Sequence, residues 1–216
     1  MTTKKNDFIE VEFTAKLSDD NEIFDTNIQS VAKKAELNTE NIKPFILSIG
    51  NKMLPSGFDE DLIGKEVEKD YSINLVPENA FGKRDPKMVR MIPTKLFHEQ
   101  NIDPIRGTQL SLDGQLVRVL SSSGGRTLID FNNPLAGKNV TYDYKITRTV
   151  TDEKEKTDAL QEFLFKQVFK SEISNEKVIF SVPKNHAPLV KMFIPKFEEI
   201  LDKKIEVVEI EESKKE

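Results

Sequence analysis

The sequence lacks several residue types on which much enzyme chemistry depends. It contains no Cys, no Trp and only two His, His98 and His186, among its 216 residues. The absence of Cys excludes disulfides, thiol nucleophiles and Cys-ligated zinc. The two His do not have the spacing of metal ligands, and a serine hydrolase would have to use one of them as its base. We therefore expect neither a metal site nor a cofactor.

The sequence also lacks long apolar runs and a strong excess of positive charge. No run approaches the ~20 apolar residues that a membrane span needs, and the N-terminal stretch MTTKKNDFIEVEF has no signal-peptide core. The formal net charge of −5 argues against nucleic-acid binding. We expect a soluble cytoplasmic protein with neither nucleic-acid nor membrane partners.

Phenylalanine, by contrast, is abundant, with 14 Phe against 3 Tyr. Strict alternation of apolar and polar residues predicts strands over residues 8–17, 67–76 and 140–150. Between the first two of these, a short helix is predicted from Ser56 to Ile63. Ser56 is expected to cap its first turn.

The sequence pattern changes after residue 82, and the pattern of residues 83–131 predicts a small β-rich unit. Asp113-Gly114 separates two short apolar runs, which is a strong hairpin signal. Beyond residue 150, helical and strand patterns alternate as αβαβ, with the second helix kinked or restarted at Pro195. Two strands joined by a helix should be parallel. Because a two-stranded sheet is marginal alone, residues 151–216 should pack on the rest of the chain or form a homodimer.

Four segments form an ordered set of motifs. Phe24-Asp25-Thr26 follows the first strand, and PFILSIGNKMLPSGFDEDLIGK, VPENAFGKRDP and NPLAGKNVTYDYKI follow in that order. This set resembles the FK506-binding-protein (FKBP) family of peptidyl-prolyl isomerases over roughly residues 7–150. The last two segments bracket an insert, and they resemble the SlyD-like and long archaeal branch of that family.

The resemblance implies an α+β fold in three domains. Residues 1–82 and 132–150 would form the isomerase domain, an antiparallel sheet wrapped around one short helix. Residues 83–131 would form an insert-in-flap domain, and residues 151–216 a C-terminal αβαβ domain.

The resemblance also implies a dry apolar pocket that favours the twisted X-Pro amide and needs no cofactor. Asp25, Phe81 and the backbone N–H of Leu54 would be its catalytic groups, with Asp25 polarising the field and Leu54 holding a carbonyl. Phe58 would form the floor, in place of the usual Trp. The other pocket residues would be Phe13, Phe24, Phe45, Met53 and Tyr142.

Two positions depart from the family pattern, because Phe13 and Phe81 stand where members usually carry Tyr. Each Phe keeps the ring but lacks the hydrogen-bond donor. One lost neutral hydrogen bond costs about 0.5–1.5 kcal/mol, so we expect weakened rather than absent isomerase activity. FK506-like ligands should bind weakly.

Inserts in this branch bind unfolded chains, which predicts nascent or unfolded polypeptides with X-Pro bonds as partners. Met88, Met91, Leu96 and Phe97 are the expected contacts, since Met suits promiscuous surfaces. For Leu96 and Phe97, core packing is an equal alternative. Two other functions stay open: a holdase chaperone that binds without turnover, and a structural assembly subunit built on the apolar C-terminal third.

Overall fold

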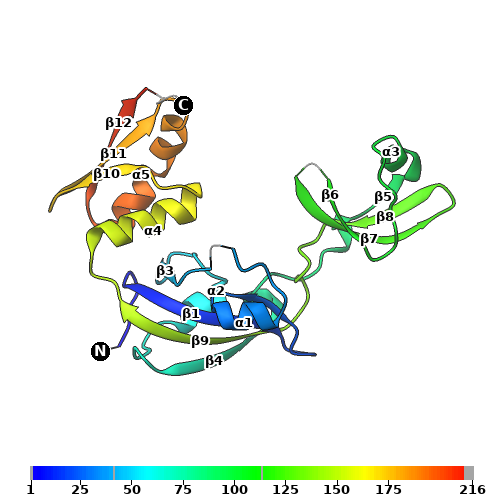
Figure 1. The fold of residues 1–216 in the computed structure, drawn as a ribbon, viewed down its shortest axis with the longest axis horizontal. Coiled ribbons are helices and arrows are strands. Elements are labelled where there is room, and N and C mark those ends of the chain that lie inside the picture. Colours follow the sequence, from blue (N-terminus) through cyan, green and yellow to red (C-terminus); the bar gives the residue numbers. More distant parts are fainter. Residues whose placement is uncertain (1, 41, 113, 212–216) are drawn as a thin grey trace.

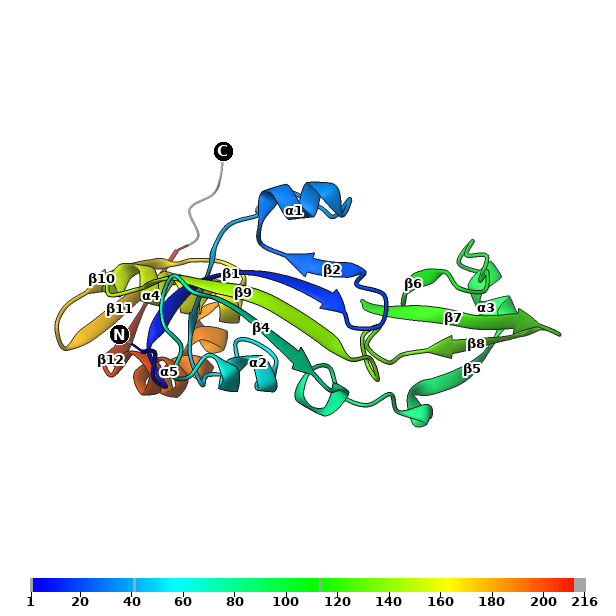
Figure 2. The same cartoon turned by 90° about the horizontal axis from the view of Figure 1, so that it is seen from below.

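The computed structural model describes residues 2–40, 42–112 and 114–211. These residues form three separate sheets of five, three and four strands. The five-stranded sheet lies in the middle, and both views show the other two at opposite ends of it (Figures 1 and 2). None of the helices in these ranges is long and apolar enough to cross a membrane.

The central sheet is antiparallel and is built mainly from the strands that the alternating patterns predict. Its order is β2-β1-β9-β4, and β3 pairs with the free part of β1. Its strands are β1 (Phe8–Leu17), β2 (Ile23–Thr26), β3 (Phe45–Ser48), β4 (Asp70–Leu75) and β9 (Val140–Thr149). Ile9, Val11 and Ala15 of β1 have no exposed surface, so the predicted inward face is confirmed.

Two short helices and a single 3-10 turn accompany this sheet. They are α1 (Gln29–Lys34), α2 (Ser56–Asp61) and η1 (Pro77–Asn79). The predicted cap of α2 is wrong, because Ser56 is the first helical residue and Pro55 precedes it without a side-chain cap. A Cβ atom on Gly57 would lie 2.6 Å from the Leu75 side chain, so only Gly allows α2 to approach β4 this closely.

The insert is a four-stranded antiparallel sheet with the order β5-β8-β7-β6. Its elements are η2 (Pro86–Met88), β5 (Val89–Pro93), α3 (Thr94–His98), β6 (Gln109–Leu112), β7 (Gln115–Ser123) and β8 (Arg126–Asp130). The predicted β6–β7 hairpin is confirmed, although Asp113 of its turn lies outside the described residues. The insert has a hydrophobic core of its own, made of Phe97, Val117, Val119 and Ile129.

The C-terminal unit, residues 153–210, differs from the expected αβαβ order by one strand. Its elements are α4 (Glu153–Phe165), β10 (Lys170–Ile173), β11 (Lys177–Pro183), α5 (Ala187–Leu201) and β12 (Lys204–Ile210). The parallel pairing of β11 with β12 is confirmed. The additional strand β10 pairs antiparallel with β11, and α5 continues past Pro195 instead of restarting there.

The C-terminal unit packs on the central sheet through a shared core. Phe8 of β1, Leu160 of α4 and Phe197 of α5 belong to one continuous cluster of buried apolar side chains. Helix α4 lies against β3 (Figure 1). The position of α4 beside the edge of the central sheet matters for the site described next.

Candidate active site

Five aromatic rings predicted to belong to one pocket do pack together. Phe58 of α2 is 0% exposed, and its ring centroid lies 4.5 Å from that of Tyr142 and 6.3 Å from that of Phe13. Phe24 of β2 joins them, with its centroid 5.9 Å from Phe81 and 6.3 Å from Tyr142. Edge-to-face contacts of this kind stabilise a rigid apolar surface.

A cleft of about 670 Å³ opens beside these rings, which is within the size range of small-ligand pockets. Five of the nine residues expected at the pocket line it: Phe13, Asp25, Phe45, Met53 and Leu54. The other four belong to the aromatic cluster and do not line the cleft: Phe24, Phe58, Phe81 and Tyr142.

Asp25 is the acidic group that β2 contributes to the cleft. Burial of its carboxyl raises its pKa, and a hydrogen bond from the Thr26 backbone offsets part of that rise. No salt bridge neutralises Asp25 within the part of the chain that the structure describes. An ionised carboxylate in this position therefore sets a negative field at the cleft.

Tyr142 is the phenol that contacts Phe13, Phe24 and Phe58. Tyr144 also contacts Phe58, but its hydroxyl donates to Asp61. Burial raises the pKa of Tyr142, and the negative charge of Asp25 raises it further. Like any ordinary phenol, this one is protonated at neutral pH and can donate a hydrogen bond, and the raised pKa keeps it so at more alkaline pH.

Asn27, which the sequence analysis did not single out, fixes the geometry of β1 beside the cleft. Its amide nitrogen donates to the Val11 carbonyl at 2.7 Å, and its amide oxygen accepts from the Phe13 N–H at 2.7 Å. The Thr26 hydroxyl adds a 2.7 Å hydrogen bond to the Phe13 carbonyl. Together these bonds hold the segment that carries Asp25 against the strand that carries Phe13.

The loop that carries Met53 and Leu54 is held by Asp59, a buried carboxylate of α2. Asp59 accepts hydrogen bonds from the N–H groups of Gly50, at 2.8 Å, and Lys52, at 3.0 Å. The Leu54 N–H donates to no other residue in the described ranges. Leu54 lines the cleft, and the role of its N–H in holding a substrate carbonyl stays a prediction.

The second side of the cleft was not foreseen. Residues of α4 or just beyond it form that side, together with the two residues before β3 and Ile46 of β3. They are Glu155, Asp158, Ala159, Glu162, Phe163, Lys166, Lys43, Pro44 and Ile46. Sequence periodicity identifies α4 as a helix, but it contains no signal for which sheet edge the helix meets.

The predicted contacts in the insert divide between surface and core. Met91 is 60% exposed and Leu96 is 49% exposed, while Met88 is half-buried. Phe97 is 3% exposed and lies in the insert core. The expectation that Phe97 meets a client directly is therefore corrected, and core packing is its role in this structure.

No group of three or more Asp, Glu or His is arranged to hold a metal ion in the described ranges. The groups at the cleft are the apolar side chains of Phe13, Phe45 and Met53, the carboxylate of Asp25, and the charged side chains of α4 and its neighbours. Such a site can bind an apolar ring and stabilise a twisted amide, with no need for proton transfer or covalent attack.

Two family models match this chain. The model described as FKBP-type peptidyl-prolyl cis-trans isomerase matches residues 1–97, and the model described as FKBP26, IF domain, matches residues 90–135. Both matches end before α4, so the C-terminal unit lies outside them.

Relatives with related names align with much of the chain. A short-type peptidyl-prolyl cis-trans isomerase of Methanocaldococcus jannaschii is 28% identical over 145 residues, which is 66% of this chain and 91% of that protein. A probable FKBP-type 16 kDa peptidyl-prolyl cis-trans isomerase of Pseudomonas fluorescens is 33% identical, covering 48% of this chain and 71% of that protein. The SlyD isomerase of Aeromonas hydrophila is 29% identical, covering 48% of this chain and 49% of that protein.

Proposed function

This chain belongs to the FKBP-type peptidyl-prolyl cis-trans isomerase family, and from that premise we propose that it isomerises X-Pro bonds in folding proteins that its insert captures. The isomerase assignment follows from the family matches. One observation above all supports the proposal that the insert captures folding proteins. The exposed apolar residues of the insert lie on a different part of the chain from the cleft beside the aromatic cluster.

Prolyl isomerisation breaks no covalent bond, so the cleft needs only to prefer the twisted amide. The barrier arises because rotation removes amide resonance, and unaided isomerisation takes tens of seconds or longer. Phe13, Phe45 and Met53 offer an apolar environment for the proline ring. The Leu54 N–H holds a substrate carbonyl, and the charge of Asp25 acts on the carbonyl that rotates.

The insert supplies capture in this proposal. Met91 and Leu96 present flexible apolar side chains to solvent, and such side chains adapt to many partners. A chain held there meets the cleft at a raised effective concentration. Catalysis of protein refolding should therefore depend on the insert more strongly than catalysis of short peptides does.

The test compares two double variants in the full chain. Met91→Ser with Leu96→Ser removes apolar surface from the insert. Leu189→Ser with Met192→Ser is the matched control in the C-terminal unit, since these residues are 42% and 65% exposed. We expect the insert variant to keep wild-type turnover of a tetrapeptide and to lose most of its acceleration of proline-limited refolding. Equal loss in both assays, or in neither, would contradict capture by the insert.

A holdase without turnover is the second candidate, and Phe13 and Phe81 in place of Tyr favour it. A holdase would delay aggregation of an unfolded protein but would leave tetrapeptide isomerisation at the uncatalysed rate. The tetrapeptide assay therefore separates the two candidates.

A further inference from the structure

The cleft has a second wall that comes from outside the residues matched by the family models. Ala159, Glu162 and Phe163 of α4 line it, together with Phe45 and Ile46 of β3. A substrate chain that enters this cleft with its proline against Phe13 and Met53 would extend along α4 as well. The cleft therefore has room for a residue next to the proline.

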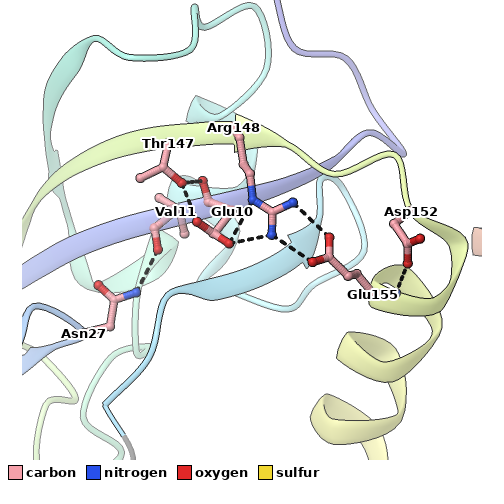
Figure 3. Close-up of polar contacts among 7 residues, drawn as sticks. All are labelled: Glu10, Val11, Asn27, Thr147, Arg148, Asp152 and Glu155. Carbon is pink, nitrogen blue, oxygen red and sulfur yellow. Dashed lines mark hydrogen bonds and ion pairs between the residues drawn. The ribbon is translucent and has the colours of Figure 1, made fainter.

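Ion pairs hold α4 at this wall. The Arg148 guanidinium bridges Glu10 of β1, at 2.8 Å, and Glu155 of α4, at 2.9 Å (Figure 3). Asp152 caps the first turn of α4 by accepting from the Glu155 N–H at 2.8 Å. Farther along the helix, the Lys43 ammonium contacts the Glu162 carboxylate at 2.6 Å. Partly exposed pairs of this kind each contribute little to stability, and they add to the burial of Leu160 of α4 in the shared core.

These ion pairs also determine which side chains of the α4 wall are already paired and which can contact a ligand. Glu155 and Glu162 are already paired with Arg148 and Lys43, and Asp158 is paired with Lys154 at 2.5 Å. The cation beside each of these carboxylates offsets its negative charge. The rest of the wall consists of Ala159, the half-buried ring of Phe163 and Lys166, whose ammonium lies 5.4 Å from the centre of the Phe163 ring. Its apolar surface is that of Ala159 and Phe163.

We propose that Phe163, supported by Ala159, contacts the substrate side chain adjacent to the proline and makes the enzyme selective for an apolar residue there. This proposal rests on the isomerase function of the cleft. Its occupant is the substrate polypeptide, because the wall is continuous with the surface formed by Phe13, Met53 and Leu54. Phe163 is then a specificity-determining residue contributed by the C-terminal unit.

The experiment measures kcat/KM of the full chain on three proline peptides. One has Leu before the proline, one has Leu after it, and one has Gly at both positions. We expect Phe163→Ala to lower kcat/KM for at least one Leu peptide by roughly two- to tenfold, the value of one aromatic contact. Turnover of the Gly peptide should stay at the wild-type level.

Two further variants keep the test decisive. Val168→Ala removes an exposed apolar side chain that does not line the cleft, so it should leave all three rates unchanged. Ala159→Leu fills the wall without removing Phe163 and should slow the Leu peptides more than the Gly peptide. This second variant also serves if Phe163→Ala fails to fold.

An unchanged Leu-to-Gly ratio in both Phe163→Ala and Ala159→Leu would overturn the proposal. If the wild-type chain turns over none of the three peptides, the isomerase function itself fails. If the wild type turns over all three peptides and neither variant changes the Leu-to-Gly ratio, the isomerase function is supported and the role of Phe163 is contradicted.

Discussion

At the scale of single residues, the proposed mechanism relies on apolar rings, one carboxylate and hydrogen-bond donors, so a single added or lost hydrogen bond should change the rate of isomerisation. Phe81 touches Phe24 at the rim of the aromatic cluster and carries no donor. Tyr142, in contact with Phe24, is the nearby phenol that carries a donor. Adding a second phenol is the direct way to measure how much activity the missing group costs.

Phe81→Tyr should raise kcat/KM for an X-Pro peptide by roughly two- to tenfold, because one added neutral hydrogen bond is worth about 0.5–1.5 kcal/mol. The measurement is peptide isomerisation by the full chain, with Phe81→Leu as the comparison that removes the ring. A rate that Tyr leaves unchanged would show that the departure at Phe81 carries no catalytic cost.

Asp25 should reduce stability at neutral pH, since its raised pKa means that the folded state binds the proton more tightly than the unfolded state does. Stability then falls as pH rises from the ordinary value of 3.8 through the folded pKa. We expect Asp25→Asn to unfold at a higher temperature than wild type at pH 7, and the two to converge below pH 3.8. Thermal unfolding across pH measures this, and a less stable variant at pH 7 would refute it.

The sequence predicts which residues lie at the site better than it predicts the side chains that hold them in place. Five expected residues do line the cleft, because the order of the motifs places them on three paired strands and on the loop that follows β3. Asn27 and Asp59 were missed, since side-chain bonds to backbone groups depend on loop geometry that no local pattern records. For Phe97, the sequence predicts core packing and contact with a client equally well, and only the packing of the insert decides between them.

At the scale of elements, β1 and the segments bonded to it hold the residues of the site in position. Asn27 bonds to the Val11 and Phe13 backbone, where β1 pairs with β9 on its other side. The register of β1 against β9 shifts between Glu10 and Val11. Bulges of this kind redirect side chains beside a site, and here Phe13 follows the shift by two residues.

Asn27→Ala should lower the free energy of unfolding by about 1–3 kcal/mol, because two hydrogen bonds are lost at about 0.5–1.5 kcal/mol each. Peptide turnover should fall with it, as Phe13 and Asp25 lose their mutual position. Urea unfolding and the peptide assay measure the two effects. Asn175→Ala, at an exposed turn position between β10 and β11, is the control and should change neither. Full activity in Asn27→Ala would argue against this positioning role.

The elements of the central sheet were predictable because each long strand alternates cleanly. Strand β10 was not, since Lys170–Ile173 is too short to show a period and acquires its structure by pairing with β11. Helix α5 continues past Pro195, although Pro cannot donate the helical hydrogen bond. Its apolar face is buried through Val190, Phe197 and Leu201, and this packing outweighs the local cost.

At the scale of the whole molecule, the three sheets differ in whether they share a hydrophobic core. The central sheet and the C-terminal unit share one core, whereas the insert has a separate core. The junction to the insert is polar: Arg84 contacts Asp130 at 2.7 Å, and Asn132 bonds to Asp130 and to the Asp85 backbone. Stability of the insert should therefore be separable from that of the cleft.

Phe97→Ala should unfold or loosen the insert while the cleft stays active. Removing a buried Phe costs about 3–5 kcal/mol, which is large for a core of four buried residues. We expect faster amide exchange in β5–β8, near wild-type exchange in β1 and β9, and unchanged peptide turnover. Loss of peptide turnover together with the insert would show that the two cores are coupled.

The most direct test of the central claim is isomerisation of a short X-Pro peptide by the full chain, with wild type and Asp25→Ala measured side by side. The account requires that wild type accelerates the reaction and that Asp25→Ala, with its fold intact by circular dichroism, loses most of that acceleration. Equal acceleration by the two proteins would contradict the role of Asp25. No acceleration by either would contradict the assignment of the cleft as an isomerase site.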